Sequence, residues 1–158
     1  GMQGLAGGLL TNAKLCYWFA CQHEAVLPLW GVQRESELAE FLSYQENIPE
    51  MDEEMRAVYE RDLKELAGDF CRGCGYCMPC PKGIQINNCA RISQLLRRSP
   101  SANWLGEEWQ AQMAKIKECI HCGQCASRCP YGLDTPKLLE KNLEDYENVL
   151  AGRVSVNE

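Results

Sequence analysis

The sequence predicts a mainly α-helical protein that begins with a small α/β segment in the order strand, helix, strand, helix. Three observations carry this prediction. Two cysteine-rich loops each run into a helical pattern, further amphipathic stretches lie before and between them, and residues 2 to 48 alternate short apolar runs with helical ones. A polar, proline-bearing stretch at residues 45 to 54 separates the two patterns. We therefore expect one domain at residues 2–48 and a helical domain at residues 49–158.

The N-terminal segment carries two predicted strands. The apolar runs "GLAGGLL" (4–10) and "AVLPLWG" (25–31) flank a predicted helix at about residues 12–22, and a second helix follows at about 35–44. Two strands alone bury little apolar surface. This segment is therefore expected to lean on the helical half or on a missing neighbour.

The remaining helices are read from apolar residues at intervals of three and four. One ends at Gly68, one follows the first cysteine loop up to Ser99, one lies between the loops, and the last opens near Thr135 and ends before Gly152. Their apolar faces are, in order, Met55, Tyr59, Leu63 and Leu66; Cys89, Ile92 and Leu96; Leu105, Trp109, Met113 and Ile116; and Leu139, Leu143, Tyr146 and Leu150.

The composition excludes several classes of protein. Sixteen Lys and Arg face 22 Asp and Glu among 158 residues, with no dense basic cluster, so nucleic acid is not an expected partner. No run approaches the roughly 20 apolar residues of a membrane span, and the N-terminus lacks the regions of a signal peptide. We expect a cytoplasmic protein with no membrane contact. In that reducing compartment, eleven cysteines indicate metal binding rather than a disulfide framework.

Eight of the cysteines belong to an internal repeat. The stretch "CRGCGYCMPCPKGI" (71–84) aligns with "CIHCGQCASRCPYGL" (119–133), and one extra residue in the second copy is the only break in register. The aligned pairs are Cys71 with Cys119, Cys74 with Cys122, Gly75 with Gly123, Cys77 with Cys125, Cys80 with Cys129, Pro81 with Pro130, Gly83 with Gly132, and Ile84 with Leu133.

The spacing of the second copy matches the bacterial ferredoxin pattern for iron-sulfur ligation, which has three cysteines at two-residue intervals, a fourth after three more residues, and then proline. A tight loop brings three thiolates to one face of a cubane, whereas the fourth ligand comes from elsewhere. In two-cluster ferredoxins the last cysteine of each run ligates the other cluster. We therefore expect two 4Fe-4S clusters in a helical ferredoxin-type domain. Their ligand sets are Cys71, Cys74, Cys77 and Cys129, and Cys119, Cys122, Cys125 and Cys80.

Two alternatives stay open at this point. The first run is one residue shorter, because only Met78 and Pro79 separate Cys77 from Cys80, so Cys80 could instead close its own cluster. The eight cysteines could also form a zinc-binding structural scaffold or a redox sensor, although structural zinc usually shows paired CxxC knuckles roughly 15 to 20 residues apart.

The other reactive side chains are expected to play structural parts. Cys16, Cys21 and Cys89 lie outside both runs, and free cysteines are commonly small buried hydrophobes. No histidine is expected to be catalytic. Arg72, Lys82 and Arg128 flank the runs and are expected to be solvated.

The two cysteine runs resemble the C-terminal dicluster 4Fe-4S ferredoxin-type domain of iron-sulfur aldo/keto reductases. The stretches "LAGGLL" and "LPLWGVQRESELAEFL" look like the last two strand and helix units of that family's barrel. The resemblance implies an electron-transfer module that forms the C-terminal part of an aldo/keto reductase-like oxidoreductase. Its expected partner is a redox protein or the aldo/keto reductase barrel.

The same resemblance limits the activity expected of this chain. The family's catalytic Asp, Tyr, Lys and His lie on earlier barrel strands, so we expect no catalytic residue here and no carbonyl reduction by this chain alone. The nicotinamide phosphate would correspond to residues 31–40, but Phe41 stands where the family often has Asn. That difference makes NADP binding by this chain doubtful.

Overall fold

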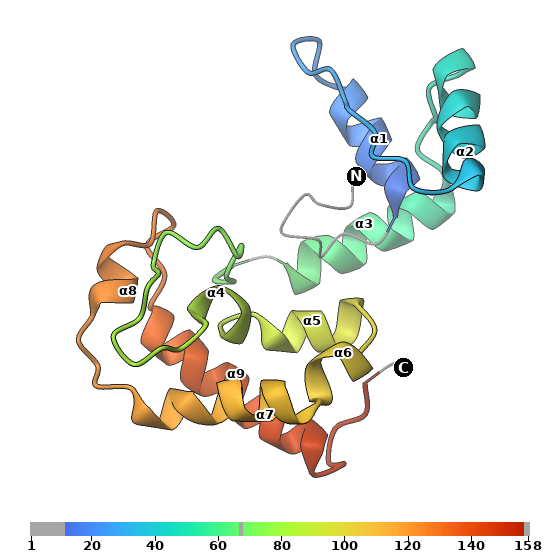
Figure 1. Ribbon diagram of the computed structural model, residues 1–158. Coiled ribbons are helices and arrows are strands. Elements are labelled where there is room, and N and C mark those ends of the chain that lie inside the picture. Colours follow the sequence, from blue (N-terminus) through green and yellow to red (C-terminus); the bar gives the residue numbers. More distant parts are fainter. Residues whose placement is uncertain (1–11, 67, 157–158) are drawn as a thin grey trace. The chain divides into compact units, whose positions relative to one another are not determined.

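The computed structural model describes residues 12–66 and 68–156, and the chain divides into two compact units, the first ending at Ala67 and the second beginning at Gly68 (Figure 1). The described residues are mainly helical, which confirms the predicted class. Among them, no helix combines the length and the apolar character that crossing a bilayer requires. The division between the two units lies later in the chain than the domain boundary expected between residues 48 and 49. That domain boundary stays a prediction.

The first unit contains helices α1 (Ala13–Cys21), α2 (Glu35–Glu46) and α3 (Glu53–Glu65), and α1 contacts α3. The predicted helices at 12–22 and 35–44 are thereby confirmed. Side-chain caps explain two of the starts. Asn12 Oδ1 accepts a hydrogen bond from the Leu15 N–H at 2.7 Å, and Asp52 Oδ1 accepts one from the Met55 N–H at 2.8 Å.

Aromatic side chains form the centre of the first unit. Tyr17 on α1 is buried, and its ring centroid lies 5.8 Å from those of Trp30, Phe41 and Tyr44. The rings of Trp30 and Phe41 also stack on each other, with centroids 5.1 Å apart. Phe41 therefore has a packing role in this unit.

The predicted strand at residues 25–31 is wrong, because this segment is irregular in the structure. A strand forms only when a neighbour completes its hydrogen-bond ladder, and no strand is present in residues 12–66 or 68–156. Pro28 also lacks an N–H to donate. The other predicted strand, at residues 4–10, lies outside the described residues. The expected barrel-tail arrangement is therefore not seen.

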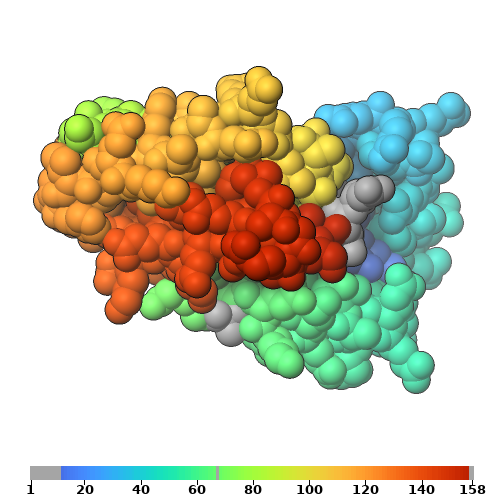
Figure 2. Space-filling model, turned by 90° about the horizontal axis from the view of Figure 1, so that it is seen from below, coloured from blue at the N-terminus to red at the C-terminus, as the bar shows by residue number. Residues whose placement is uncertain are grey.

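The second unit is built on one long helix, α9 (Thr135–Leu150), with shorter helices packed along it (Figure 1). In the space-filling view the red residues of α9 lie against the orange residues of α7 (Figure 2). The shorter elements are α4 (Ile86–Cys89), α5 (Ile92–Arg98), α6 (Ala102–Leu105), α7 (Glu107–Ala114), the 3₁₀ helix η2 (Lys115–Glu118) and α8 (Gln124–Ser127).

The hydrophobic core of the second unit lies between α5, α7 and α9. Leu96, Met113, Leu139 and Tyr146 are each at most 2% exposed. The Tyr146 hydroxyl donates a hydrogen bond of 2.7 Å to the carbonyl oxygen of Trp104, so its polar end is satisfied within the core. The apolar faces predicted for these stretches therefore point inward at these four residues, whereas Leu150, predicted on the face of the last helix, is 43% exposed.

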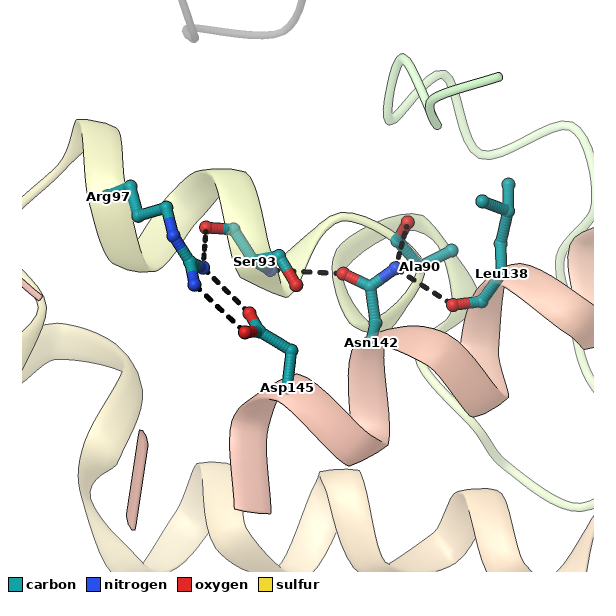
Figure 3. Close-up of polar contacts among 6 residues, drawn as sticks. All are labelled: Ala90, Ser93, Arg97, Leu138, Asn142 and Asp145. Carbon is teal, nitrogen blue, oxygen red and sulfur yellow. Dashed lines mark hydrogen bonds and ion pairs between the residues drawn. The ribbon is translucent and has the colours of Figure 1, made fainter. Parts of the chain in front are cut away.

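The sequence predicts one helix after the first cysteine loop, but the structure breaks it into α4 and α5 at Ala90 and Arg91. The cause is Asn142 on α9, which is 4% exposed and binds the broken backbone (Figure 3). Its Nδ2 donates to the carbonyl oxygens of Ala90 (3.1 Å) and Leu138 (2.8 Å), and its Oδ1 accepts from the Ser93 N–H at 3.0 Å. The side-chain amide thus replaces bonds that a continuous helix would make.

One turn further along, Arg97 and Asp145 join the same two helices by a paired ion contact (Figure 3). The two guanidinium nitrogens of Arg97 donate to the two oxygens of Asp145 at 2.7 and 2.8 Å, and the pKa of that carboxyl lies below its ordinary value chiefly because of this bond. The Arg97 side chain is 41% exposed, so the pair contributes at most about 1 kcal/mol to stability.

Replacement of Asn142 by alanine is expected to lower the free energy of unfolding of the second unit by about 2–4 kcal/mol. The change leaves the Ser93 N–H and the Ala90 carbonyl without their buried partner, at about 1–3 kcal/mol for each group. Denaturant titration measures the effect. Glu144→Ala, on the exposed face of the same helix, is the control and should change stability by less than about 0.5 kcal/mol. Equal stability of the Asn142 variant and the control would contradict this account of the helix break.

Candidate metal centres

The two cysteine loops have the same backbone conformation at three aligned positions. Gly75 and Gly123 have φ of 82° and 75°, and Gly83 and Gly132 have φ of 68° and 64°. The third pair is Gly73 and His121, with φ of 70° and 50°. A left-handed conformation is ordinary for glycine but uncommon for histidine, so His121 adopts the backbone geometry that its aligned glycine also has. The sequence repeat is therefore also a structural repeat.

The repeat continues beyond the loops into the helices that follow. The N–H of Ile86, which begins α4, donates to the Ile84 carbonyl at 2.9 Å, and the N–H of Thr135, which begins α9, donates to the Leu133 carbonyl at 2.9 Å. The first residues of α4 and α9 are therefore as far apart in the sequence as the aligned pair Ile84 and Leu133. Ser93 and Asn142, which hydrogen-bond to each other, share that offset. The helices of the two copies therefore cross at equivalent positions.

One cavity opens at the first cysteine loop. It encloses about 360 Å³ of empty space, open solvent included. Its wall contains three cysteines of the first loop together with the last cysteine of the second loop, and Leu133 and Leu138 supply apolar surface. The four cysteines are Cys71, Cys74, Cys77 and Cys129.

A second cavity of about 400 Å³, open solvent again included, lies at the second cysteine loop. Three cysteines of that loop and the last cysteine of the first loop line it, with apolar surface from Ile84 and Leu139. These cysteines are Cys119, Cys122, Cys125 and Cys80. Cys77 also reaches this wall, and Ile86 contributes to both cavities, so one turn of chain separates the two hollows.

Burial controls the acidity of the thiols. It raises the pKa of Cys71, and the neighbouring Cys74 and Cys129 thiols raise that pKa further. Burial also raises the pKa of Cys77 to about 11 and is the main cause of the raised pKa of Cys125. These thiols are therefore protonated at neutral pH unless a cation binds them, and metal binding would release their protons.

Contacts between the two loops hold the cavities side by side. The guanidinium of Arg72 lies 4.3 Å from the ring centroid of Tyr131 and 4.6 Å from that of Phe70, so the expectation that Arg72 is simply solvated is wrong. Gln124 Nε2 donates to the Pro79 carbonyl at 2.8 Å. Gln124 begins α8, the short helix that accommodates the extra residue of the second copy.

The donors of both cavities fit a group larger than a single ion. All eleven cysteines are free thiols, and residues 70–84 and 119–133 contain no Asp or Glu. A tetrahedral Zn²⁺ with Zn–S bonds of about 2.3 Å draws its sulfur atoms to within about 3.8 Å of each other. Within residues 12–66 and 68–156, no three His, Cys, Asp or Glu side chains converge in that way. Each set of four thiols lines one cavity, and thiolates are the ligands that an iron-sulfur cube takes.

The remaining cysteines lie outside both cavities. Cys16 and Cys89 are buried, as expected, and Cys21 is half-buried against the aromatic cluster of the first unit.

Two charged residues near the loops, Arg91 and Glu140, were not anticipated from the sequence. Extending the repeat alignment past Leu133 would have paired them, because they are separated by the same offset as Ile84 and Leu133.

Comparison with known proteins agrees with this geometry. Searches of curated proteins and of solved structures find no match to the chain. A family model described as a 4Fe-4S dicluster domain matches residues 70–134. The matched region begins just before Cys71 and ends just before α9. Both cysteine loops and all eight cavity-lining cysteines lie within the residues that this model matches.

Proposed function

We propose that the second unit binds two 4Fe-4S clusters and carries electrons, one at a time, between redox partners. The observation that carries the proposal is the composition of the two cavities. Each is lined by the first three cysteines of one loop and the last cysteine of the other loop, and Cys77 borders the second cavity as well as the first. This is the ligand pattern of two-cluster ferredoxins.

The ligands are assigned accordingly. The first-loop site consists of Cys71, Cys74, Cys77 and Cys129, and the second-loop site consists of Cys119, Cys122, Cys125 and Cys80. The influence of the Cys129 thiol on the pKa of Cys71 supports the exchange of fourth ligands. The shorter spacing of the first run is compatible with this exchange. Gln124 and Arg128 of the second loop both hydrogen-bond to the Met78–Pro79 backbone, so the segment before Cys80 lies against the second loop.

The residues around the thiols have three tasks. The thiolates ligate the cluster iron. The Gly73 N–H donates to Cys71 Sγ, with its nitrogen at 3.4 Å, and stabilises negative charge on that sulfur. Ile86, Leu133 and Leu139 keep water from the inner walls. A bound 4Fe-4S cluster supplies a carrier that takes up and releases single electrons. Cys74 and Cys122 are exposed, and there the sites come closest to a partner.

The partner that we propose is a redox protein in the reducing cytoplasm, with an aldo/keto reductase-like barrel as the first candidate. The support is the resemblance of the stretches "LAGGLL" and "LPLWGVQRESELAEFL" to the end of such a barrel. The test is to reduce the loaded protein, to add a barrel of that family together with a carbonyl substrate, and to follow reoxidation of the clusters by the recovery of their visible absorbance. No oxidation would reject this partner and leave cluster binding unaffected.

Anaerobic purification tests cluster binding directly. The chain is expected to be brown, to contain about eight iron and eight sulfide per molecule, and to lose visible absorbance on reduction. Cys89→Ala, a buried thiol outside both cavities, should keep the full iron content. A colourless protein with bound zinc, or a chain that binds no metal, would overturn the proposal.

A further inference from the structure

A cation lies directly over the first cysteine loop. A β-carbon built on Gly73 would lie 2.6 Å from the Cζ atom of Arg91 and within 2.9 Å of both terminal guanidinium nitrogens. The Arg91 guanidinium therefore lies in the space that a β-carbon at residue 73 would take. Gly75, another positive-φ glycine of the same loop, has no neighbour within 4 Å, so the close contact at Gly73 is made by the arginine.

The Arg91 guanidinium lies beside a residue that hydrogen-bonds to a thiol of the first loop. The Gly73 N–H donates to Cys71 Sγ at 3.4 Å, and the Arg91 guanidinium covers the same residue. Arg91 is half-buried, which limits the screening of its charge by water.

The second loop has the opposite arrangement at the equivalent place. The repeat aligns Gly73 with His121 and, through the offset shared by the helix starts, Arg91 with Glu140. Glu140 Oε1 lies 3.9 Å from His121 Nε2, so the aligned contact is conserved in position but reversed in the charge of its helical member. The Glu140 side chain is 60% exposed, and its effect should be weaker than that of Arg91.

We infer that Arg91 and Glu140 make the two iron-sulfur sites unequal, so that the first-loop site is the easier of the two to reduce. The inference rests on the proposed binding of two clusters. One electron adds one negative charge to a site, and a nearby cation stabilises this charge whereas a nearby carboxylate destabilises it. An electron that enters at the second-loop site would therefore pass to the first-loop site. The first site is reduced, the second is reoxidised, and no bond or proton changes place.

Redox titration of the loaded protein, followed by electron paramagnetic resonance, tests the assignment. We expect two midpoint potentials in the unaltered chain. Arg91→Gln should lower the higher potential alone, by about a tenfold change in the equilibrium constant for reduction, or about 59 mV for one electron. Arg91→Lys retains the charge and should restore most of the difference. Glu140→Gln should raise the lower potential alone, and by a smaller amount.

The matched control is Arg153→Gln, which removes the same charge at the far end of α9. Arg153 Nε bonds to Asn148 Oδ1 at 2.7 Å, and the 16-residue helix places this end about 24 Å from Thr135.

The outcomes separate this inference from the proposed function. Full iron content with both potentials unmoved in Arg91→Gln, or a shift of the lower potential, would overturn the inference and leave cluster binding intact. A shift of equal size in the Arg153 control would also overturn it, because the effect would then be one of net charge. Absence of iron would instead reject the proposed function.

Discussion

Chelation of the iron is expected to remove amide-exchange protection from the two cysteine loops, while α5, α7 and α9 retain most of theirs. Apart from side-chain contacts such as those of Arg72 with Tyr131 and of Gln124 with Pro79, the loops have little other support. Across residues 70–85 and 119–134, the one regular element is the four-residue α8. Helices shorter than about 12 residues are marginal on their own in water. We therefore expect bound clusters to be the main source of order in both loops.

The other end of the unit has an independent source of stability. Leu96, Met113 and Tyr146 are each at most 1% exposed and pack between α5, α7 and α9. Asn142 and the ion pair of Arg97 with Asp145 join α5 to α9 without any contribution from the cysteines. These contacts remain when the thiols lose their metal, so unfolding should be local.

Hydrogen-exchange mass spectrometry on the loaded protein, before and after anaerobic chelation, measures this pattern. Peptides from residues 70–85 and 119–134 should exchange at least a hundredfold faster after chelation, which corresponds to about 2.7 kcal/mol of lost local stability. Peptides from α1 and α2 in the first unit serve as the internal control. If α9 lost its protection together with the loops, the clusters would hold the whole unit. If the loops kept theirs, the protein chain alone would order them.

Local patterns in the sequence were sufficient for most helices and for the candidate sites. The predicted helices at 12–22 and 35–44 follow from a cap and from apolar spacing, which act within a few residues. The eight cysteines follow from the repeat, because cluster ligation demands a fixed spacing. What remained open was whether Cys80 faces its own loop, since that depends on how the two loops fold against each other.

The failures all involve partners far away in the chain. The helix after the first loop breaks because Asn142 binds the backbone at Ala90 and Ser93, and no window around residue 90 contains that information. The strand at 25–31 failed because strands need a paired neighbour, whereas helices satisfy their own backbone. The pairing of Arg91 with Glu140 can be seen only when the repeat is extended into the helices. The contact of Arg91 with Gly73 depends on how the chain folds back over the first loop.

Alanine at Cys129 is expected to abolish the cluster of the first-loop site, although Cys129 belongs to the second loop. The reason is the wall of the first cavity, where Cys129 stands with Cys71, Cys74 and Cys77. Iron should fall from about eight to about four per chain. The surviving resonance spectrum should match that of Cys71→Ala. By the same reasoning, Cys80→Ala should match Cys119→Ala.

Double variants make the exchange of ligands decisive. If Cys71 and Cys129 serve one cluster, replacing both costs no more iron than replacing either, because the second change acts on a site that is already lost. Replacing Cys80 and Cys129 together should remove nearly all iron, because each change empties a different site. Ligation within each loop makes a different prediction: Cys129→Ala would share the spectrum of Cys119→Ala, and the Cys71 and Cys129 pair would lose everything. Full iron content in Cys89→Ala would show that the loss of a buried thiol is not in itself the cause.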